Sequence, residues 1–540
     1  MTSKRLLGSS FSVLFAGLIS CGVLAEDVVV TLTPEGWLAK PLPEIAAGLQ
    51  AGEIAAQALV TAYLDRIEQI DRSGPTLQSV LTLNPDALAR AQALDARRAA
   101  GEAIGPLHGV PILLKDNIEA KGNMATTAGA LALRDNVTGR DSPLVEGLRA
   151  AGAIILGKTN LSQWANFRSN SSMSGWSALG GQVRNPHMLD RNPCGSSSGS
   201  GAAAAASLAA GTVGTETNGS VICPSNANGI VGFKPTVGLV PQQYIIPISS
   251  TQDTAGPMTK TVRGAAMMLT AMASGPGATD YTAGLDTDAL QGARIGVLRF
   301  AQGSNADIHT HFNEALSALE AAGATLVEIV DREEPSDSFW DQAGMVLNVE
   351  FKATLNTYLA STPDTVKTRT LTELIAFNEA NARVELALFN QDIFIEADAM
   401  KGLDDPDYVK ARDTVVAAMG VGGIDTLMSK HEVDVLVSPS GALAPRVDPV
   451  NGDVWPDWAG AGSMAAIAGY PHLTVPMGTV HSVPIGLSFF GTKGADSEVL
   501  GYGYAYEQAT HMRAEPQYLE NAEALADIAT AMSPYNRPEN

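Results

Sequence analysis

The amino-acid sequence predicts an α/β protein. Short apolar segments that suit strands buried on both faces, such as 110–114, alternate with segments whose apolar residues recur at helical spacing, such as 41–70. The same alternation appears in 294–330, beyond a turn-rich boundary at 276–280. It therefore indicates one continued sheet rather than the start of a new fold. The length of 540 residues alone allows one large domain or two ordinary ones.

The remaining elements follow from local patterns. Residues 84–101 begin with an Asn-Pro-Asp cap and end at a glycine, which predicts a helix, and 144–161 predict a helix, a glycine turn and a buried strand. The polar segment 251–257 is expected to be a loop, and the helix-rich, more polar segment 336–430 suits a cover over one face. Later strands with turns are expected at 229–235, 238–241, 294–298, 325–330, 433–439, 470–476 and 484–491, and later helices at 261–273 and 306–322.

The stretch 194–224 is the most informative part of the chain. It opens with serines among glycines and continues into an Ala-rich segment, 202–210, which predicts a helix that stops at Gly211. A β-branched strand follows at once. A helix of ~13 residues spans ~20 Å and a six-residue strand returns about as far. Ser220 is therefore expected to lie beside Ser196.

Two other interpretations of this stretch are less consistent with its neighbours. Gly/Ser-rich runs are commonly flexible linkers, but a linker is not followed directly by its own core helix and strand. Residues 195–199 also match G-x-S-x-G, the nucleophile turn of α/β-hydrolases. That motif needs a hydrophobic strand directly before it, whereas 185–193 is a polar turn with two prolines.

Lys115 is a candidate catalytic base because of its position at the end of the predicted strand 110–114. A lysine at a strand end ordinarily points to solvent. Loops at strand ends, however, are where α/β sheets place their chemistry. If Lys115 is buried, desolvation lowers its pKa and makes a neutral amine available as a general base.

Composition argues against several classes of function. The formal net charge of −22 disfavours nucleic acid and anionic lipid as partners. The chain has no CxxC or HExxH motif and its eight histidines are scattered, so no metal or other cofactor is expected. The pair His309 and His311 suits a solvated helix start better than a ligand pair.

The N-terminus predicts export to the periplasm or the exterior. Lys4 and Arg5 precede an apolar run that ends in a small-residue site, so residues 1–25 are interpreted as an export signal with cleavage after Ala25. Cys21 also lies in a lipobox-like context, and lipidation there is the one route by which the chain would reach a membrane. The two later cysteines, Cys194 and Cys223, form a disulfide if their Cα atoms lie within about 7 Å, or else remain free thiols.

Several ordered motifs together resemble the amidase signature family. They are Gly-Pro-Leu-His-Gly-Val-Pro followed by Lys115-Asp-Asn-Ile, the Gly-Ser-Ser-Ser-Gly run, Thr-Asn-Gly-Ser220, Gly-Phe-Lys-Pro-Thr and Asp-Thr-Ala-Gly-Pro-Met. The resemblance extends from about Pro41 to Thr510 and is weakest over 276–430. It implies one large domain, 26–540, with a mixed central sheet covered by helices on both faces and a C-terminal tail at 511–540.

The resemblance also implies catalytic roles. Ser220 would be the nucleophile that forms an acyl-enzyme, Ser196 a bridging serine after a cis peptide bond, and Lys115 the base that drives proton transfer through it. These roles agree with the physics, because a serine hydroxyl is a weak nucleophile until a base takes its proton. The oxyanion hole would consist of the backbone N–H groups of Thr217, Asn218, Gly219 and Ser220.

Two departures from the family pattern bear on the site. Ile222 stands where the family usually has an arginine, so an anion-binding role of that arginine is absent, and Asn218 replaces a glycine and places a side chain at the rim. The motif around Glu216 and the Cys223-Pro224 pair is closest to the peptide amidase branch. That branch implies hydrolysis of the C-terminal amide of peptides to acid and ammonia, without a cofactor and without cleavage of internal bonds.

Three alternatives stay open. The chain could hydrolyse small aryl or acyl amides or esters with the same residues. It could be a glutaminase-type subunit of an amidotransferase, which would need partner subunits and a cytosolic location. It could also be a catalytically silent binding protein. The sequence leaves the oligomeric state unspecified.

Overall fold

The structure is a computed structural model that describes residues 32–534. The predicted export signal, 1–25, and Cys21 lie outside the described residues. The strands are β1 Val80–Leu83, β2 Pro111–Lys115, β3 Ile154–Thr159, β4 Trp176–Ser177, β5 Gly181–Gln182, β6 Gly211–Glu216, β7 Val231–Lys234, β8 Thr254–Thr259, β9 Arg294–Leu298, β10 Thr325–Ile329, β11 Val435–Pro439, β12 His472–Val480 and β13 Val483–Phe490.

The helices include several short ones. They are α1 Pro34–Leu38, α2 Leu42–Ala51, α3 Ala56–Arg66, α4 Ala87–Ala99, α5 Pro143–Ala150, α6 Ser198–Ala205, α7 Ile222–Ala227, α8 Val262–Met272, α9 Ala306–Ala321, α10 Phe339–Ala360, α11 Leu371–Ala380, α12 Ala382–Glu385, α13 Asp392–Asp398, α14 Pro406–Met419, α15 Thr426–His431, α16 Gly462–Ala468, α17 Asp496–Thr510 and α18 Ala526–Met532. Of the helices within 32–534, none is both long and apolar enough to cross a membrane.

A mixed sheet of eleven strands forms the centre of the molecule, in the order β1-β3-β2-β6-β8-β7-β12-β13-β11-β9-β10. Neighbours are parallel in β3-β2-β6 and in β11-β9-β10, and antiparallel elsewhere. Strands from both sides of the 276–280 boundary therefore belong to one sheet. The predicted α/β class with a single large sheet is confirmed.

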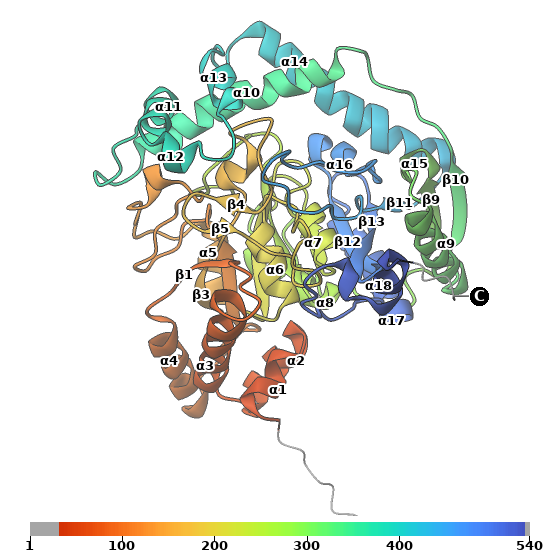
Figure 1. Ribbon diagram of the computed structural model, residues 1–540. Helices are drawn as coiled ribbons and strands as arrows, with labels where there is room; N and C mark the ends of the chain where they lie inside the picture. The colour runs from red at the N-terminus through yellow and green to blue at the C-terminus, as the bar shows by residue number, and fades with distance from the viewer. Residues whose placement is uncertain (1–31, 535–540) are drawn as a thin grey trace, which may run out of the picture.

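Helices flank the sheet on both faces (Figure 1). Helices α6 and α7 contact each other, and α6 forms a small apolar cluster with Met258 of β8 and with Val221 and Ile230, which flank α7. Helices α8, α9 and α17 contact the sheet from the side to which Ala255, three positions earlier in β8, points. Because side chains alternate between the faces of a strand, Met258 and Ala255 mark opposite faces.

Residues 336–430 are rich in helix, as predicted, but these helices cross one end of the molecule, whereas a cover over one face was expected. Helices α10 to α14 lie along the top of the view in Figure 1, with α10 running across the sheet-containing body. Helix α10 packs against α13 and α14 and contributes Phe351 and Leu355 to an apolar cluster that also contains Trp164. This layer thereby contacts the loops that follow the sheet strands.

The Ala-rich helix is shorter than predicted. The helix α6 ends at Ala205, and Ser207 has a positive φ of 59° before β6 begins at Gly211. The backbone N–H of Ala210 donates to the carbonyl of Pro111, the first residue of β2. Alanine favours helix, but the hydrogen bonds of a central sheet position decide the local conformation here.

Several strand assignments also differ from the sequence predictions. Strand β8 occupies 254–259, most of the expected polar loop, and β1, β4 and β5 were not predicted. Residues 238–241 form no strand in the described structure. The β8 sequence contains glycine and proline, which are rare in strands. It is a strand because its backbone pairs with β6 on one side and β7 on the other.

Candidate active site

Lys115 is the last residue of β2 and its side chain is fully buried. Its Nζ donates hydrogen bonds to Ser196 Oγ at 2.7 Å, to Thr215 Oγ1 at 2.9 Å and to the Thr215 carbonyl at 3.1 Å. Strand β6 runs parallel to β2, and this pairing places Thr215 beside the end of β2. The sheet and the loop before α6 thus supply every described acceptor of this amine.

Burial lowers the pKa of the Lys115 amine to about 7, because removal from water disfavours the charged form. The carboxylates of Asp253 and Glu216 act in the opposite direction and raise it. Burial outweighs them. Near neutral pH, a large share of the molecules therefore carries an uncharged amine that can accept a proton.

The serine run at the start of α6 is hydrogen-bonded to strand β6 of the sheet. Ser197 Oγ donates to the Thr215 carbonyl at 3.1 Å and accepts from the Thr215 N–H at 3.2 Å. The peptide bond between Gly195 and Ser196 is cis, as the family resemblance implies. A Cβ at Gly214 would lie 2.7 Å from Ser197 Oγ, so the close approach of this turn to β6 requires a glycine there.

Ser220 lies beside the serine run, as predicted. The Ser197 N–H donates to the Ser220 carbonyl at 3.1 Å. Among the described residues no hydrogen bond joins Ser220 Oγ to Ser196 Oγ. Catalytic hydrogen bonds often close only when substrate is bound. The segments that carry Lys115, Ser196 and Ser220 therefore meet, with the Lys115–Ser196 contact formed.

The turn before Ser220 presents unused donors. In the part of the chain that the structure describes, the backbone N–H groups of 217–220 donate no hydrogen bond, whereas those of Val221 and Ile222 donate to Glu216 Oε2 at 2.8 and 3.0 Å. Gly219 has a φ of +83°, a conformation that favours glycine. Asn218 is exposed at the rim, where the sequence placed it. These donors suit an oxyanion.

A disulfide joins the two sides of this site. Cys194 and Cys223 are bonded, with their Cα atoms 5.8 Å apart. Cys194 comes two residues before Ser196, and Cys223 comes three residues after Ser220. The alternative of free thiols is therefore wrong in this structure.

Ser220 opens on a cavity of about 380 Å³. The turn 217–220 and the disulfide form part of its wall, and α10 contributes to it. Apolar side chains from several separate segments also line it: Phe167, Ile222, Ile248, Leu347, Trp455 and Trp458. Pockets for small organic ligands are lined in this way, mostly by apolar groups with a few polar ones.

Sequence reasoning missed several residues that build the site. Thr215 and Ser197 hold Lys115 and the serine run, and Asp253 accepts from Thr217 Oγ1 at 2.6 Å and from two backbone N–H groups. Burial raises the pKa of Asp253 to about 6. The pairing of β6 with β2 was the signal that could have identified Thr215, since it sets which residue lies beside Lys115.

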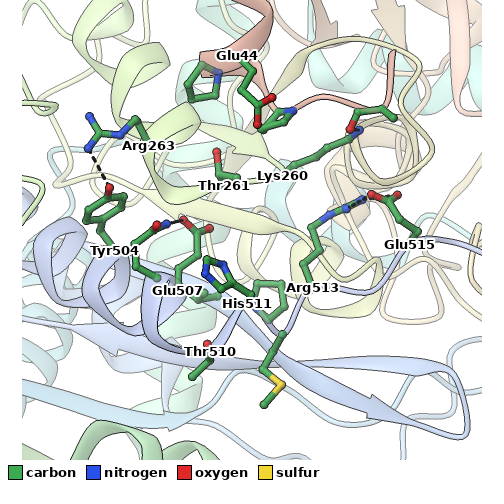
Figure 2. Close-up of a pocket in the computed structure, with 17 residues that line it drawn as sticks. Glu44, Lys260, Thr261, Arg263, Tyr504, Glu507, Thr510, His511, Arg513 and Glu515 are labelled. Atoms are coloured by element: carbon green, nitrogen blue, oxygen red, sulfur yellow. Dashed lines mark hydrogen bonds and ion pairs between the residues drawn. The ribbon is translucent and has the colours of Figure 1, made fainter. Parts of the chain in front are cut away.

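A second cavity, of about 490 Å³, lies between α8 and the end of α17 (Figure 2). Its labelled side chains are mostly charged, with Arg263 hydrogen-bonded to Tyr504 and Arg513 paired with Glu515. Lys115 and the two serines do not line it. Within 32–534, no group of three or more His, Cys, Asp or Glu side chains is arranged to hold a metal ion.

Comparison with known proteins places the chain in one family. The family model described as Amidase matches residues 58–500. A solved structure of native peptide amidase from Stenotrophomonas maltophilia is 45% identical, with a TM-score of 0.84, and the match covers 90% of this chain and 100% of that one.

Two curated relatives are also similar over most of their length. A probable amidase from Arabidopsis thaliana is 34% identical, over 88% of this chain and 91% of its own. A glutamyl-tRNA(Gln) amidotransferase subunit from Halorhodospira halophila is 34% identical, over 87% of this chain and 97% of its own. With this match and this fold, the chain belongs to the amidase signature family of hydrolases and is an amidase.

Proposed function

We propose that this amidase hydrolyses the C-terminal carboxamide of peptides, R–CO–NH₂ + H₂O → R–COOH + NH₃, through an acyl-enzyme on Ser220. The observation that carries the proposal is the buried Lys115 amine bonded to Ser196 Oγ at 2.7 Å, next to the cavity that Ser220 lines. A base at the end of a short relay is what a serine hydroxyl needs to become a nucleophile.

In the first half-reaction, Ser220 Oγ attacks the carbonyl carbon of the carboxamide. Its proton passes through Ser196 Oγ to the neutral Lys115 Nζ. The oxyanion that forms accepts hydrogen bonds from the free N–H groups of 217–220. The protonated relay then delivers its proton to the departing NH₂ group, the C–N bond breaks, and ammonia leaves an ester between the acyl group and Ser220.

In the second half-reaction, a water molecule takes the place of ammonia. The relay removes one proton from the water as its oxygen attacks the ester carbonyl. The C–O bond to Ser220 breaks, the proton returns to Ser220 Oγ, and the acid leaves. The same residues serve both steps, which are chemically the reverse of each other apart from the exchanged nucleophile.

The peptide amide substrate is supported by the 45% identity to the peptide amidase of Stenotrophomonas maltophilia over 90% of this chain. The apolar cavity walls also suit a side chain of the substrate. The test compares an amidated dipeptide with its internal peptide bond, with anilides and with esters. Release of ammonia with the internal bond intact supports the proposal. Faster turnover of small anilides or esters would assign the alternative substrate class.

The Ser220 assignment has its own test. An acylating serine probe should label the wild-type enzyme at Ser220, as located by peptide mass spectrometry, and should fail to label Ser220→Ala. The Ser196→Ala variant should label slowly at the same residue, because the nucleophile is present and its relay is broken. Labelling at another serine would overturn the assignment.

We also propose that the chain is exported, with residues 1–25 as its signal. The support is the basic and apolar N-terminal pattern, together with the Cys194–Cys223 disulfide, since disulfides persist mainly in oxidising compartments. Mass spectrometry of the mature protein should find an N-terminus at Glu26. A lipid on Cys21 would instead indicate a membrane-anchored form, and an unprocessed N-terminus would contradict export.

A further inference from the structure

A buried polar cluster forms part of the wall of the Ser220 cavity. His472, at the start of β12, and Ser440, after β11, both line this cavity. His472 is 1% exposed, its Nε2 lies 2.7 Å from Ser488 Oγ, and Ser488 Oγ donates to Ser440 Oγ at 2.9 Å. The other ring nitrogen, His472 Nδ1, is buried and has no hydrogen-bond partner among the described residues. A buried polar atom of this kind calls for an explanation.

The hydrogen bonds of the cluster determine which nitrogen carries the proton. The hydroxyl of Ser488 has one proton and donates it to Ser440, so His472 Nε2–H must be the donor in the contact with Ser488. His472 Nδ1 then carries a lone pair. Burial, together with the positive charge of Lys234, lowers the pKa of His472 to about 3, and the ring is neutral at ordinary pH. His472 Nδ1 is therefore a hydrogen-bond acceptor.

Gly462 lies against the ring edge that bears this acceptor. It is the first residue of α16 and also lines the cavity. A Cβ built there would lie 2.8 Å from His472 Cε1 and 3.3 Å from His472 Nδ1. Any larger residue at 462 would therefore press on the ring edge that bears Nδ1. The close approach of α16 to this ring edge therefore requires a glycine at 462.

We propose that His472 Nδ1 accepts a hydrogen bond from the backbone N–H of the substrate residue whose carboxamide is hydrolysed. The inference rests on the proposed peptide amidase function and adds a specificity-determining residue to it. The substrate must supply a donor. The carboxamide nitrogen must face the Ser196–Lys115 relay, because the relay delivers the proton with which this nitrogen leaves as ammonia, so we assign the contact to the next donor along the substrate.

The next donor along a peptide amide is the N–H one carbon away from the carbonyl. Simple aryl and alkyl carboxamides have no N–H at this place. A cavity that holds an otherwise unpartnered acceptor discriminates against a ligand that leaves this acceptor unpaired. His472 thus selects acylated amino acid amides over carboxamides of the same bulk that lack the N–H.

The experiment compares N-acetylphenylalaninamide with N-acetyl-N-methylphenylalaninamide, which lacks the donor. In His472→Gln, the glutamine amide reaches the place of Nε2 and can still donate to Ser488, but no acceptor remains at Nδ1. In His472→Asn, the shorter amide places an oxygen near Nδ1 and loses the contact with Ser488. The two variants therefore separate the acceptor from the structural hydrogen bond.

The measured quantity is the ratio of kcat/KM for the N–H substrate to that for the N-methyl substrate. We expect this ratio to fall about 10-fold in His472→Gln, mainly through KM of the N–H substrate, and to be retained in His472→Asn. A merely structural role of His472 would lower kcat for both substrates together and leave the ratio unchanged. An unchanged ratio in His472→Gln overturns the inference.

A second variant tests the same contact without altering the imidazole. Gly462→Ala adds a methyl group against the ring edge that bears Nδ1, and the ratio should fall as in His472→Gln. Circular dichroism and thermal unfolding verify that each variant is folded. If the wild-type enzyme hydrolyses neither substrate, the proposed function is contradicted, and so is this inference, which rests on it. If the N–H substrate is hydrolysed but all variants give the wild-type ratio, this inference alone fails.

Discussion

The amine of Lys115 lies 2.7 Å from the hydroxyl of Ser196, although 81 residues separate them in the chain. Strand β2 carries the lysine and the turn before α6 carries the serine. Strand β6 pairs with β2, and its Thr215 accepts hydrogen bonds from both Lys115 and Ser197, the residue next to Ser196. The contact is buried, and burial is what lowers the pKa of the amine to about 7. The buried packing of β2, β6 and the turn before α6 thus both positions the Lys115 amine and lowers its pKa.

Replacement of Lys115 should abolish turnover. In Lys115→Met we expect kcat to fall by about 10,000-fold, because the relay has no base, with a small effect on substrate binding. The matched control is Lys158→Met, since Lys158 is also fully buried but donates to Ile118 and Thr126, away from the serines. The control should lower thermal stability and leave the folded fraction active. A near-normal rate in Lys115→Met would exclude it as the base.

The pH dependence of kcat/KM should report Lys115. The neutral amine is the active form and its pKa is lowered to about 7, so activity should rise through pH ~7 and be lost as the amine is protonated below it. Arginine stays charged, so Lys115→Arg should be inactive throughout.

The carboxyl of Asp253 also has a pKa raised to about 6. The loss of kcat/KM at low pH, the acidic limb of the profile, must therefore be assigned either to Lys115 or to Asp253. The Asp253 carboxylate raises the pKa of Lys115, and Asp253→Asn should therefore move the limb to lower pH. If the limb belongs to Asp253 itself, the limb should disappear in that variant instead. Rate profiles from pH ~5 to ~9 distinguish the two results.

Two adjacent serines should respond differently to the same change. Ser196→Ala should reduce kcat by about 1,000-fold or more with little loss of stability, because Lys115 keeps its two acceptors on Thr215. Ser197→Ala leaves the buried N–H of Thr215 without its partner, which should cost about 1–3 kcal/mol of unfolding free energy. Denaturant unfolding and steady-state kinetics, measured on both variants, check the contrast. Equal loss of activity in both would place Ser197 in the relay as well.

Loss of the disulfide should destabilise the protein. The bond closes a loop with a sequence separation of 29, and chain entropy predicts that its removal costs about 3–4 kcal/mol. Reduction with dithiothreitol followed by alkylation should lower the midpoint of thermal unfolding, and the Cys194→Ala/Cys223→Ala variant should behave alike. Activity should also fall, since the bond ties the Ser196 turn to the Ser220 turn. An unchanged midpoint in both preparations would show that the folded core holds these turns without it.

Local sequence patterns were sufficient for much of the sheet. The wholly apolar segment 110–114 predicted β2 because burial on both faces leaves no polar positions in a strand, and the largely apolar segments 294–298 and 433–439 predicted β9 and β11. The same reasoning missed β8, whose Gly-Pro sequence has low strand propensity and which is a strand through its pairing with β6 and β7. The motif resemblance identified Lys115, Ser196 and Ser220 as candidates. It could do so because the sequence itself specifies which residues carry a hydroxyl or an amine.

What the sequence by itself determined is therefore the α/β class and the family, together with three candidate catalytic residues. Tertiary structure alone decided their environment: that Lys115 is buried, that Thr215 and Ser197 hold it against Ser196, that Cys194 and Cys223 are bonded, and that His472 Nδ1 has no partner among the described residues that form the cavity wall. The physical reason is that the sequence gives the identity of each residue directly. The desolvation of a side chain and its hydrogen-bond partners depend on segments that meet only when the sheet is complete.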